Sequence, residues 1–314
     1  MALNTTSTLP AAVQQSFDGK LLSIPVAHMI HKIVSVKKSM PANGGTTLRM
    51  RRYNQLDTAM VPLGNTGETP PADVASVVDI DAKVSFYGKY MYLNEQVTLQ
   101  SQDNVLNAFV DLLGVSMRRT EDHLTRDMLM STASFINCTG GVNGDRPTEI
   151  TRSDVDLVTG QLYYNNGKFI EEGIEGSTKF GTAPIRDSFV ALGSAKLIGN
   201  LDNTGGFVSN AQYPSKMAAP SEWGSIGNLR FFLSSEGSVS SAASMLGADV
   251  YNIFCVAKEA YASIEQDNYS SQFIYHGPEF SGPLNLNASV GYKFAEVPRI
   301  LNDLWILNLR TTLA

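Results

Sequence analysis

The sequence feature that most constrains the fold is a long stretch of helical periodicity between Ser101 and Asn137. Ser101 or Asp103 can cap its N-terminus, and the Gly140–Gly141 pair just beyond it supplies a stop. Such a helix spans about 50 Å, the full width of a compact ball of 314 residues. We therefore predict a flat or elongated subunit with one helix as its spine. The apolar face consists of Leu106, Phe109, Val110, Leu113, Met117, Leu124 and Met128.

Two other interpretations of this stretch remain open from periodicity alone. It can be the core helix of an ordinary enzyme, or two helices broken near Gly114 or Thr120. Asp122 and Arg126 have the favourable i, i+4 spacing for an ion pair. The charged residues form a side that faces solvent or another subunit: Arg118, Arg119, Glu121, Asp122, Arg126 and Asp127.

Composition argues against several classes of protein. The charged fraction of 17% is below the usual quarter, which fits a chain that buries surface against partners. A net charge of -6 argues against a general nucleic-acid binder. Cys138 and Cys255 lie in no motif and indicate free thiols. Neither a signal peptide nor an apolar run of membrane-spanning length is found, so we expect a soluble protein made in the cytosol.

The N-terminal third has little core of its own. Residues 1–20 are predicted to form an arm, and residues 21–36 a short helix or a strand. His28 and His31, three residues apart, suit a metal site only if distant ligands join them, and two structural histidines fit better. Two β-prone pieces around the Pro-Ala-Asn-Gly-Gly turn at 41–45 predict a hairpin. Because such a ribbon is marginal alone, we expect it to lie against a neighbouring subunit.

Charge is segregated in the same region. No acidic residue occurs between Asp18 and Asp57. Aromatic residues for base stacking are nearly absent, so a basic ribbon that docks on an acidic neighbour fits better than nucleic-acid binding. The basic residues of this segment are Lys20, Lys32, Lys37, Lys38, Arg49, Arg51 and Arg52.

The remaining segments alternate between strands and helices. Residues 74–99 are β-rich, and 151–164 form a helix capped by Thr151 or Ser153. Residues 186–202 are predicted to form a helix, 226–234 a strand, and 248–265 two extended pieces around a turn. The C-terminal section is predicted to form two strands around a short linker, and its apolar run 304–307 is expected to enter a central sheet.

Sequence motifs for catalysis are absent. There is no phosphate loop, dinucleotide fingerprint, nucleophile elbow or zinc-ligand spacing. The glycine-rich 140–144 segment lacks the strand and helix context of a phosphate cradle. Glu171 and Glu172 are adjacent and have no nearby histidine, which favours a solvated loop over an acid–base pair. We therefore predict a protein that is not an enzyme and has no catalytic residue, cofactor or metal.

The order and spacing of several strings resemble a known family. Residues 48–64 (LRMRRYNQLDTAMVPLG), 68–71 (ETPP), 87–90 (YGKY), 223–232 (WGSIGNLRFF), 291–293 (GYK) and the ending LNDLWIL carry the likeness. They resemble the major capsid proteins of tailed phages with the α+β Hong Kong-97-like fold, closest to the coat proteins of the phage N-four type. The resemblance covers the chain from about residue 20 to its end.

This resemblance implies a division of the chain. Residues 1–34 would be an N-terminal arm and 35–73 an extended hairpin loop. Residues 74–150 would form a peripheral domain around the spine helix, joined by strands within 223–237 and 283–314. Residues 151–222 and 238–282 would form an axial domain. Some members cross-link a loop lysine to a neighbour, but Lys37 and Lys38 are not expected to do so.

The same resemblance implies a function and partners. The chain would assemble as hexamers and pentamers into the icosahedral head of a tailed double-stranded DNA phage. It would be made in the host bacterial cytoplasm and reside in the virion. Portal, separate scaffolding and possible decoration proteins would be partners, and the DNA would be enclosed without sequence-specific binding. An encapsulin-like nanocompartment shell and a soluble α+β hydrolase are the alternatives. The candidate inter-subunit contacts are Lys37, Lys38, Arg49, Arg51, Arg52, Glu68, Arg118, Arg119 and Arg126.

Overall fold

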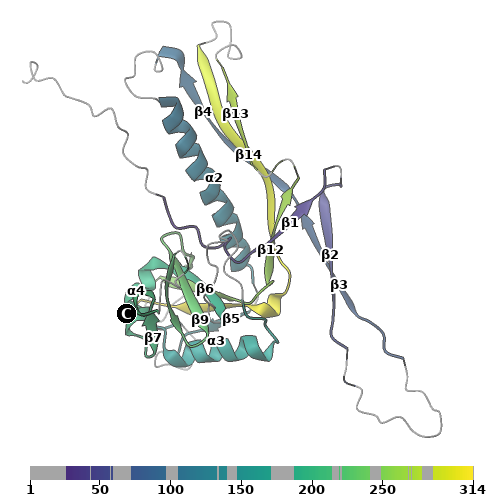
Figure 1. Ribbon diagram of the computed structural model, residues 1–314, viewed down its shortest axis with the longest axis vertical. Coiled ribbons are helices and arrows are strands. Elements are labelled where there is room, and N and C mark those ends of the chain that lie inside the picture. Colours follow the sequence, from purple (N-terminus) through teal and green to yellow (C-terminus); the bar gives the residue numbers. More distant parts are fainter. Residues whose placement is uncertain are drawn as a thin grey trace, which may run out of the picture.

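A computed structural model describes most of the chain. The subunit is elongated: helix α2 lies beside long strands, a compact body lies at one end of the helix, and a two-stranded ribbon projects outward (Figure 1). The described residues are 26–42, 44–56, 58, 72–96, 105–132, 134–139, 147–170, 187–213, 219, 221–240, 249–267, 269, 271–277 and 286–313.

Helix α2, Val105–Met130, is the predicted spine, about 39 Å long. It continues through Gly114 and Thr120, so the two-helix alternative is wrong. The predicted end at Asn137 is also wrong. The N–H groups of Ser131 and Thr132 turn back to carbonyls three residues earlier, and residues 135–137 form strand β5 instead. The predicted cap at 101–103 and the stop at 140–141 lie outside the described residues.

The apolar face of α2 packs on a sheet, mainly on its long strand β14, Asn287–Ile300. Leu113 and Met117 are buried against Val290, Tyr292 and Phe294, with Leu106 and Leu124 partly buried at the edges. Val110, expected on this face, is 38% exposed. Within the described residues this sheet has five strands, namely β1 (Val36–Met40), β12 (Tyr261–Gln266), β14 (Asn287–Ile300) and β13 (Gln272–His276), with β4 (Ser85–Asn94) paired to β14.

A second sheet forms the compact body. Strands β6, β9 and β11 are buried at every residue, which explains their continuous apolar runs. Helices α3 (Arg152–Tyr164) and α4 (Ile198–Asn203) cover one face, and Leu129 of α2 packs on the other. The described strands follow the order β5 (Phe135–Asn137), β15 (Ile306–Thr311), β11 (Val250–Val256), β6 (Phe189–Ser194), β9 (Leu229–Ser234), β8 (Glu222–Ile226) and β7 (Phe207–Ser209), with β10 (Val239–Ser240) on β11.

The ribbon differs from the predicted hairpin. Strand β2, Thr47–Tyr53, pairs antiparallel with β3, Val77–Lys83, rather than with β1. Strand β1 instead runs parallel to β12. The Pro41–Gly44 turn does form, but it links two different sheets. The ribbon's inner face is apolar, and it packs Leu48, Met50, Ile80 and Ala82 on Met40, Val84, Ile264 and Ala295.

Of the other predicted helices and strands, some are confirmed and one is partly wrong. Helix α3 is confirmed, and Asp154 accepts hydrogen bonds from the Thr151 N–H and hydroxyl at 3.0 and 2.6 Å. The two C-terminal strands are confirmed, although Leu304 is 55% exposed and only Ile306 and Leu307 enter the sheet. The predicted helix 186–202 is wrong in its first half, which forms the buried strand β6 followed by a short 3-10 turn, Ala195–Leu197, and α4.

The sheet topology also differs from the expected grouping of strands. Strand β9, within 223–237, lies between β6 and β8 in the second sheet rather than beside α2. The C-terminal segment contributes one strand to each sheet, β14 and β15. Residues 26–35, expected as helix or strand, form irregular chain with one turn. The boundaries expected for the peripheral and axial domains therefore do not follow the observed sheets.

Adjacent leucines of α2 provide a test of this packing. Leu113 is 1% exposed and Leu112 is 42% exposed. Leu113→Ala should lower the free energy of unfolding by about 2–5 kcal/mol because it leaves a cavity against β14. Leu112→Ala should change it by less than about 0.5 kcal/mol. Urea unfolding of the unassembled chain measures both, and equal effects would contradict the assigned face.

Candidate assembly surfaces

Polar side chains of residues 31 and 32 join α2 to the neighbouring elements. His31 is fully buried; its N–H donates to Asp122 Oδ1 at 2.8 Å, and its Nδ1 lies 2.7 Å from Asp122 Oδ2. The Tyr261 hydroxyl donates to the His31 carbonyl at 2.5 Å. Asp122 is 2% exposed, so its expected place on a solvated face, paired with Arg126, is wrong. The hydrogen bonds from His31, 91 residues earlier in the chain, offset the cost of burying this carboxylate.

Lys32 contacts three carboxylates at once. Its Nζ lies 3.1 Å from Glu121 Oε2, 3.0 Å from Glu265 Oε1 and 3.0 Å from Glu296 Oε2. We call these four residues the Lys32 cluster. Burial alone would lower the pKa of Lys32, but attraction to Glu296 and Glu121 outweighs it and raises that pKa. Burial, together with repulsion from Glu296 and Glu265, raises the pKa of Glu121 despite the lysine.

A second polar contact holds α2 to the compact body. Arg119 Nη2 and His123 Nε2 lie 2.6 and 3.0 Å from the Glu236 carboxylate, and Arg126 donates to the Glu236 carbonyl at 3.2 Å. Burial opposes ionisation of Glu236, but the hydrogen bonds from His123 and Arg119 prevail and lower its pKa. Two of the predicted inter-subunit residues, Arg119 and Arg126, therefore make contacts within their own chain.

The ribbon's basic residues also have partners within the chain. Arg49 Nε lies 2.7 Å from Asp81 Oδ1 across the two strands, and Arg51 Nε lies 2.9 Å from Asp79 Oδ1. The hydrogen bond from Arg49 lowers the pKa of Asp81. These pairs are exposed and contribute little to stability. The outer face of the ribbon therefore carries Asp79 and Asp81 against Arg49, Arg51 and Lys83, so its basic charge is largely offset, unlike that of the basic segment predicted between Asp18 and Asp57.

The remaining candidates are scattered. Lys37 and Arg118 are exposed, and Lys38 is partly buried on β1. Arg52 lies on the inner, apolar face of the ribbon, in register with Val78. Glu68 lies outside the described residues, as do Glu171, Glu172 and the 140–144 segment.

Features expected of an enzyme are sparse in the described residues. Their His, Cys, Asp and Glu side chains form no group that could hold a metal ion. His28, proposed beside His31 as a ligand, lies 3.1 Å from the Ser221 hydroxyl instead. Both cysteines are free and buried, and burial raises the pKa of the Cys255 thiol to about 12. No described helix has both the length and the apolar character needed to cross a membrane.

Exposed large apolar side chains include two groups on the ribbon and on β4. At the distal end of the ribbon, Tyr53, Leu56, Val74 and Val77 are 43–89% exposed. On β4, Phe86, Tyr90 and Tyr92 are each more than 60% exposed. These three alternate with Tyr87 and Met91, which face α2, so the aromatic residues lie on the sheet face that α2 does not cover. We call this surface the outer sheet face.

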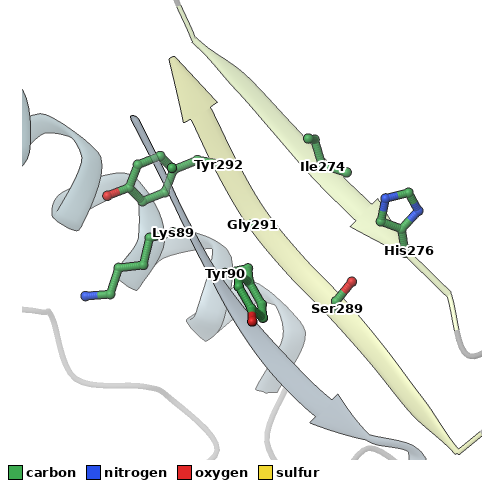
Figure 2. A pocket seen from close by; sticks show the side chains of 8 residues that line it. Lys89, Tyr90, Ile274, His276, Ser289, Gly291 and Tyr292 are labelled. Carbon is green, nitrogen blue, oxygen red and sulfur yellow. The ribbon is translucent and has the colours of Figure 1, made fainter. Parts of the chain in front are cut away.

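A shallow hollow of about 290 Å³ lies on the same sheet. Figure 2 shows Tyr90, Ile274, Ser289 and His276 around it, from strands β4, β13 and β14. Its floor depends on Gly291, because a Cβ there would lie 2.9 Å from the Lys89 carbonyl oxygen. The close approach of β4 and β14 therefore requires glycine at this position. Such exposed aromatic surface with a hollow is typical of protein–protein contact sites.

Sequence reasoning missed most of these features. The alternation Phe86, Tyr90, Tyr92 was visible in a β-rich segment and could have indicated an exposed aromatic face. The Lys32 cluster had no such signal, because its carboxylates come from residues 121, 265 and 296.

Comparisons with solved structures identify the fold. The chain superimposes over its full length on the acid-stable capsid of Helicobacter pylori bacteriophage KHP30, with TM-score 0.69, 11% identity and coverage of 100% and 98% of the two chains. The head of Helicobacter pylori bacteriophage KHP40 gives TM-score 0.68, 12% identity and the same coverage. The capsid of cyanophage P-SCSP1u gives TM-score 0.66 and 11% identity, with coverage of 100% of this chain and 97% of the other.

These matches define the class of fold. The chain has the α+β Hong Kong-97-like fold of tailed-phage capsid structures, which confirms the predicted fold class. No protein-family model and no curated protein matches the sequence. The more specific likeness to the N-four-type coat proteins stays a prediction.

Two substitutions in the Lys32 cluster should affect the free energy of unfolding differently. Lys32→Met should lower the free energy of unfolding by about 2–4 kcal/mol at pH 7, because three carboxylates lose their cation. Glu121→Gln should leave stability unchanged or raise it. The raised pKa of Glu121 means that its ionised form costs stability at neutral pH, a cost that disappears as pH falls through that pKa.

Urea unfolding of the unassembled chain between pH 5 and 8 measures both effects. The wild type should gain stability relative to Glu121→Gln as the pH falls across this window. An equal loss for Lys32→Met and Glu121→Gln would contradict the assigned charge balance.

Proposed function

We propose that this chain is the major capsid protein of a tailed double-stranded DNA phage. It assembles as hexamers and pentamers into an icosahedral head and resides in the virion. The observation that carries this proposal is the full-length likeness of the fold to phage capsid and head structures. The nanocompartment and hydrolase alternatives gain no support from these neighbours.

The exposed apolar surfaces support the same function. A two-stranded ribbon is marginal in water where it lacks packing partners. Tyr53 pairs with Val77 at the end of β2 and β3 farthest from the Thr47–Lys83 pair, and both side chains are exposed. In a shell, the ribbon end and the outer sheet face would both be covered by neighbouring copies. Obligate interfaces of this kind commonly bury a few thousand Å².

The domain roles follow the observed sheets. We assign the peripheral role to α2 with the five-stranded sheet, the axial role to the eight-stranded sheet with α3 and α4, and the extended loop to the ribbon. Residues 26–35 would continue the N-terminal arm. Portal, scaffolding and decoration proteins are further partners in this proposal, and DNA is enclosed without sequence-specific binding.

Shortening the ribbon tests the proposed function. The Asn54 N–H donates to the Ser76 carbonyl at 2.9 Å, so residues 55–75 can be replaced by Asn-Gly across an existing hydrogen bond. No residue of the ribbon's buried cluster is lost. The unassembled variant should therefore unfold within about 0.5 kcal/mol of wild type, but form no complete shells in electron micrographs.

Two outcomes would contradict the proposal. Complete shells from the shortened chain would exclude an essential role for the ribbon end. A wild-type chain that remains monomeric at high concentration under all assembly conditions would overturn the capsid function itself.

A further inference from the structure

Strand β4 forms a long edge of the five-stranded sheet. All ten of its residues pair with β14 in one continuous register. Gly291 of β14 pairs with Tyr90 of β4 on one side and with Ile274 of β13 on the other, so β4 and β13 lie on opposite edges. Among the described residues β4 pairs with no strand other than β14. Alternate residues of such a strand direct their backbone N–H and C=O groups away from the sheet, where another strand can pair with them.

Strand β4 lacks the features that usually prevent an edge strand from pairing with another chain. Proteins shorten such strands, interrupt them with proline or a bulge, or place charged residues on them, lysine above all. β4 contains no proline, its ladder with β14 has no bulge, and Lys89 is its only charged residue. Phe86, Tyr90 and Tyr92 favour the extended conformation and are each more than 60% exposed. The edge is therefore suited to pairing with a further strand.

The other edge strands in the described part of the chain are short or charged. In the same sheet, β1 carries Lys37 and Lys38 within five residues, and β13 has only five residues. In the second sheet, β5, β7 and β10 have three residues or fewer. The ribbon strands β2 and β3 alternate charged and apolar residues along most of their length. Strand β4 is thus the one long described edge with so little charge on it.

We propose that β4 pairs antiparallel with β4 of a second copy about a two-fold axis, which joins the two five-stranded sheets into one. A two-fold contact uses the same surface on both copies, so self-pairing leaves neither β4 edge open. Any other described edge strand of the second copy is short or charged. With the axis perpendicular to the sheet, the outer sheet faces of both copies lie on the same side, and their aromatic residues can form cross-strand pairs. The proposal rests on the proposed capsid function, because an icosahedral shell contains two-fold axes.

Cross-linking of single-cysteine variants in assembled shells locates the axis. From the strand spacing and the rise per residue, two copies of a residue lie about 8 Å apart when it is one position from the axis and about 14 Å apart when it is two positions away. A bis-maleimide that spans about 10 Å therefore joins two copies only within one residue of the axis. Phe86→Cys, Lys89→Cys and Tyr92→Cys, all at exposed side chains, together cover almost the whole strand. We expect cross-linked dimers from one of the three, and none from the wild type, in which Cys138 and Cys255 are buried.

The matched control is Tyr275→Cys, at a similarly exposed aromatic residue on β13, which should give no dimer. Shells that give no dimer at any of the three β4 positions overturn self-pairing while leaving the capsid function intact. Links between Lys89→Cys and Tyr275→Cys copies mixed in one shell, without β4 self-links, overturn it in favour of a head-to-tail contact through β13. A wild-type chain that never forms shells overturns both proposals.

Hydrogen exchange of the wild type gives a second measurement that needs no variant. In the unassembled chain, the β4 amides that point towards β14 should be protected, and those that point away from the sheet should exchange rapidly. In shells we expect exchange of the outward amides to slow by about tenfold or more, because they become hydrogen-bonded to the second copy. Outward amides that exchange as fast in shells as in the unassembled chain would indicate that the outer sheet face is covered without strand pairing, and would overturn the proposal.

Discussion

The whole subunit depends on holding one long helix against two different sheets. The apolar face of α2 packs on β14 and β4 of the first sheet, and its C-terminal end packs on the second. Polar contacts join the helix to the other elements. Asp122 is hydrogen-bonded to His31, and Glu121 forms an ion pair with Lys32. Arg119 and His123 contact the carboxylate of Glu236 in the compact body. Because these contacts lie on several sides of the helix, its rotation and position are determined by a few charged side chains.

In the proposed shell, this arrangement would separate the surfaces used within the subunit from those that contact other copies. Four of the nine residues predicted to face a neighbour, Arg49, Arg51, Arg119 and Arg126, have polar partners inside the chain. Exposed apolar side chains lie at the described end of the ribbon and on the aromatic outer sheet face. Assembly would then be driven by apolar burial at those two surfaces.

The sequence predicted elements whose signals are local. The periodicity of Leu113 and Met117 located the helix, and Thr151 with Asp154 located the start of α3. It failed where partners are distant. Residues 47–53 pair with 77–83 rather than with the nearer strand, because alternation alone does not choose between partners. Asp122 was predicted to be solvated because no residue near it in the sequence indicates that His31 is its partner. The candidate inter-subunit contacts stay a prediction, and the partners of Arg49 and Arg119 within the chain were not indicated by nearby residues.

A cryo-electron microscopy reconstruction of shells assembled from the full chain tests the central claim most directly. We expect His31 and Lys32 to contact Asp122 and Glu121 of their own subunit. We also expect neighbouring copies to bury Tyr53, Val77 and the Phe86–Tyr90–Tyr92 face. Residues 31 and 32 inserted instead into another subunit's helix, or an outer sheet face left open to solvent in the closed shell, would contradict it.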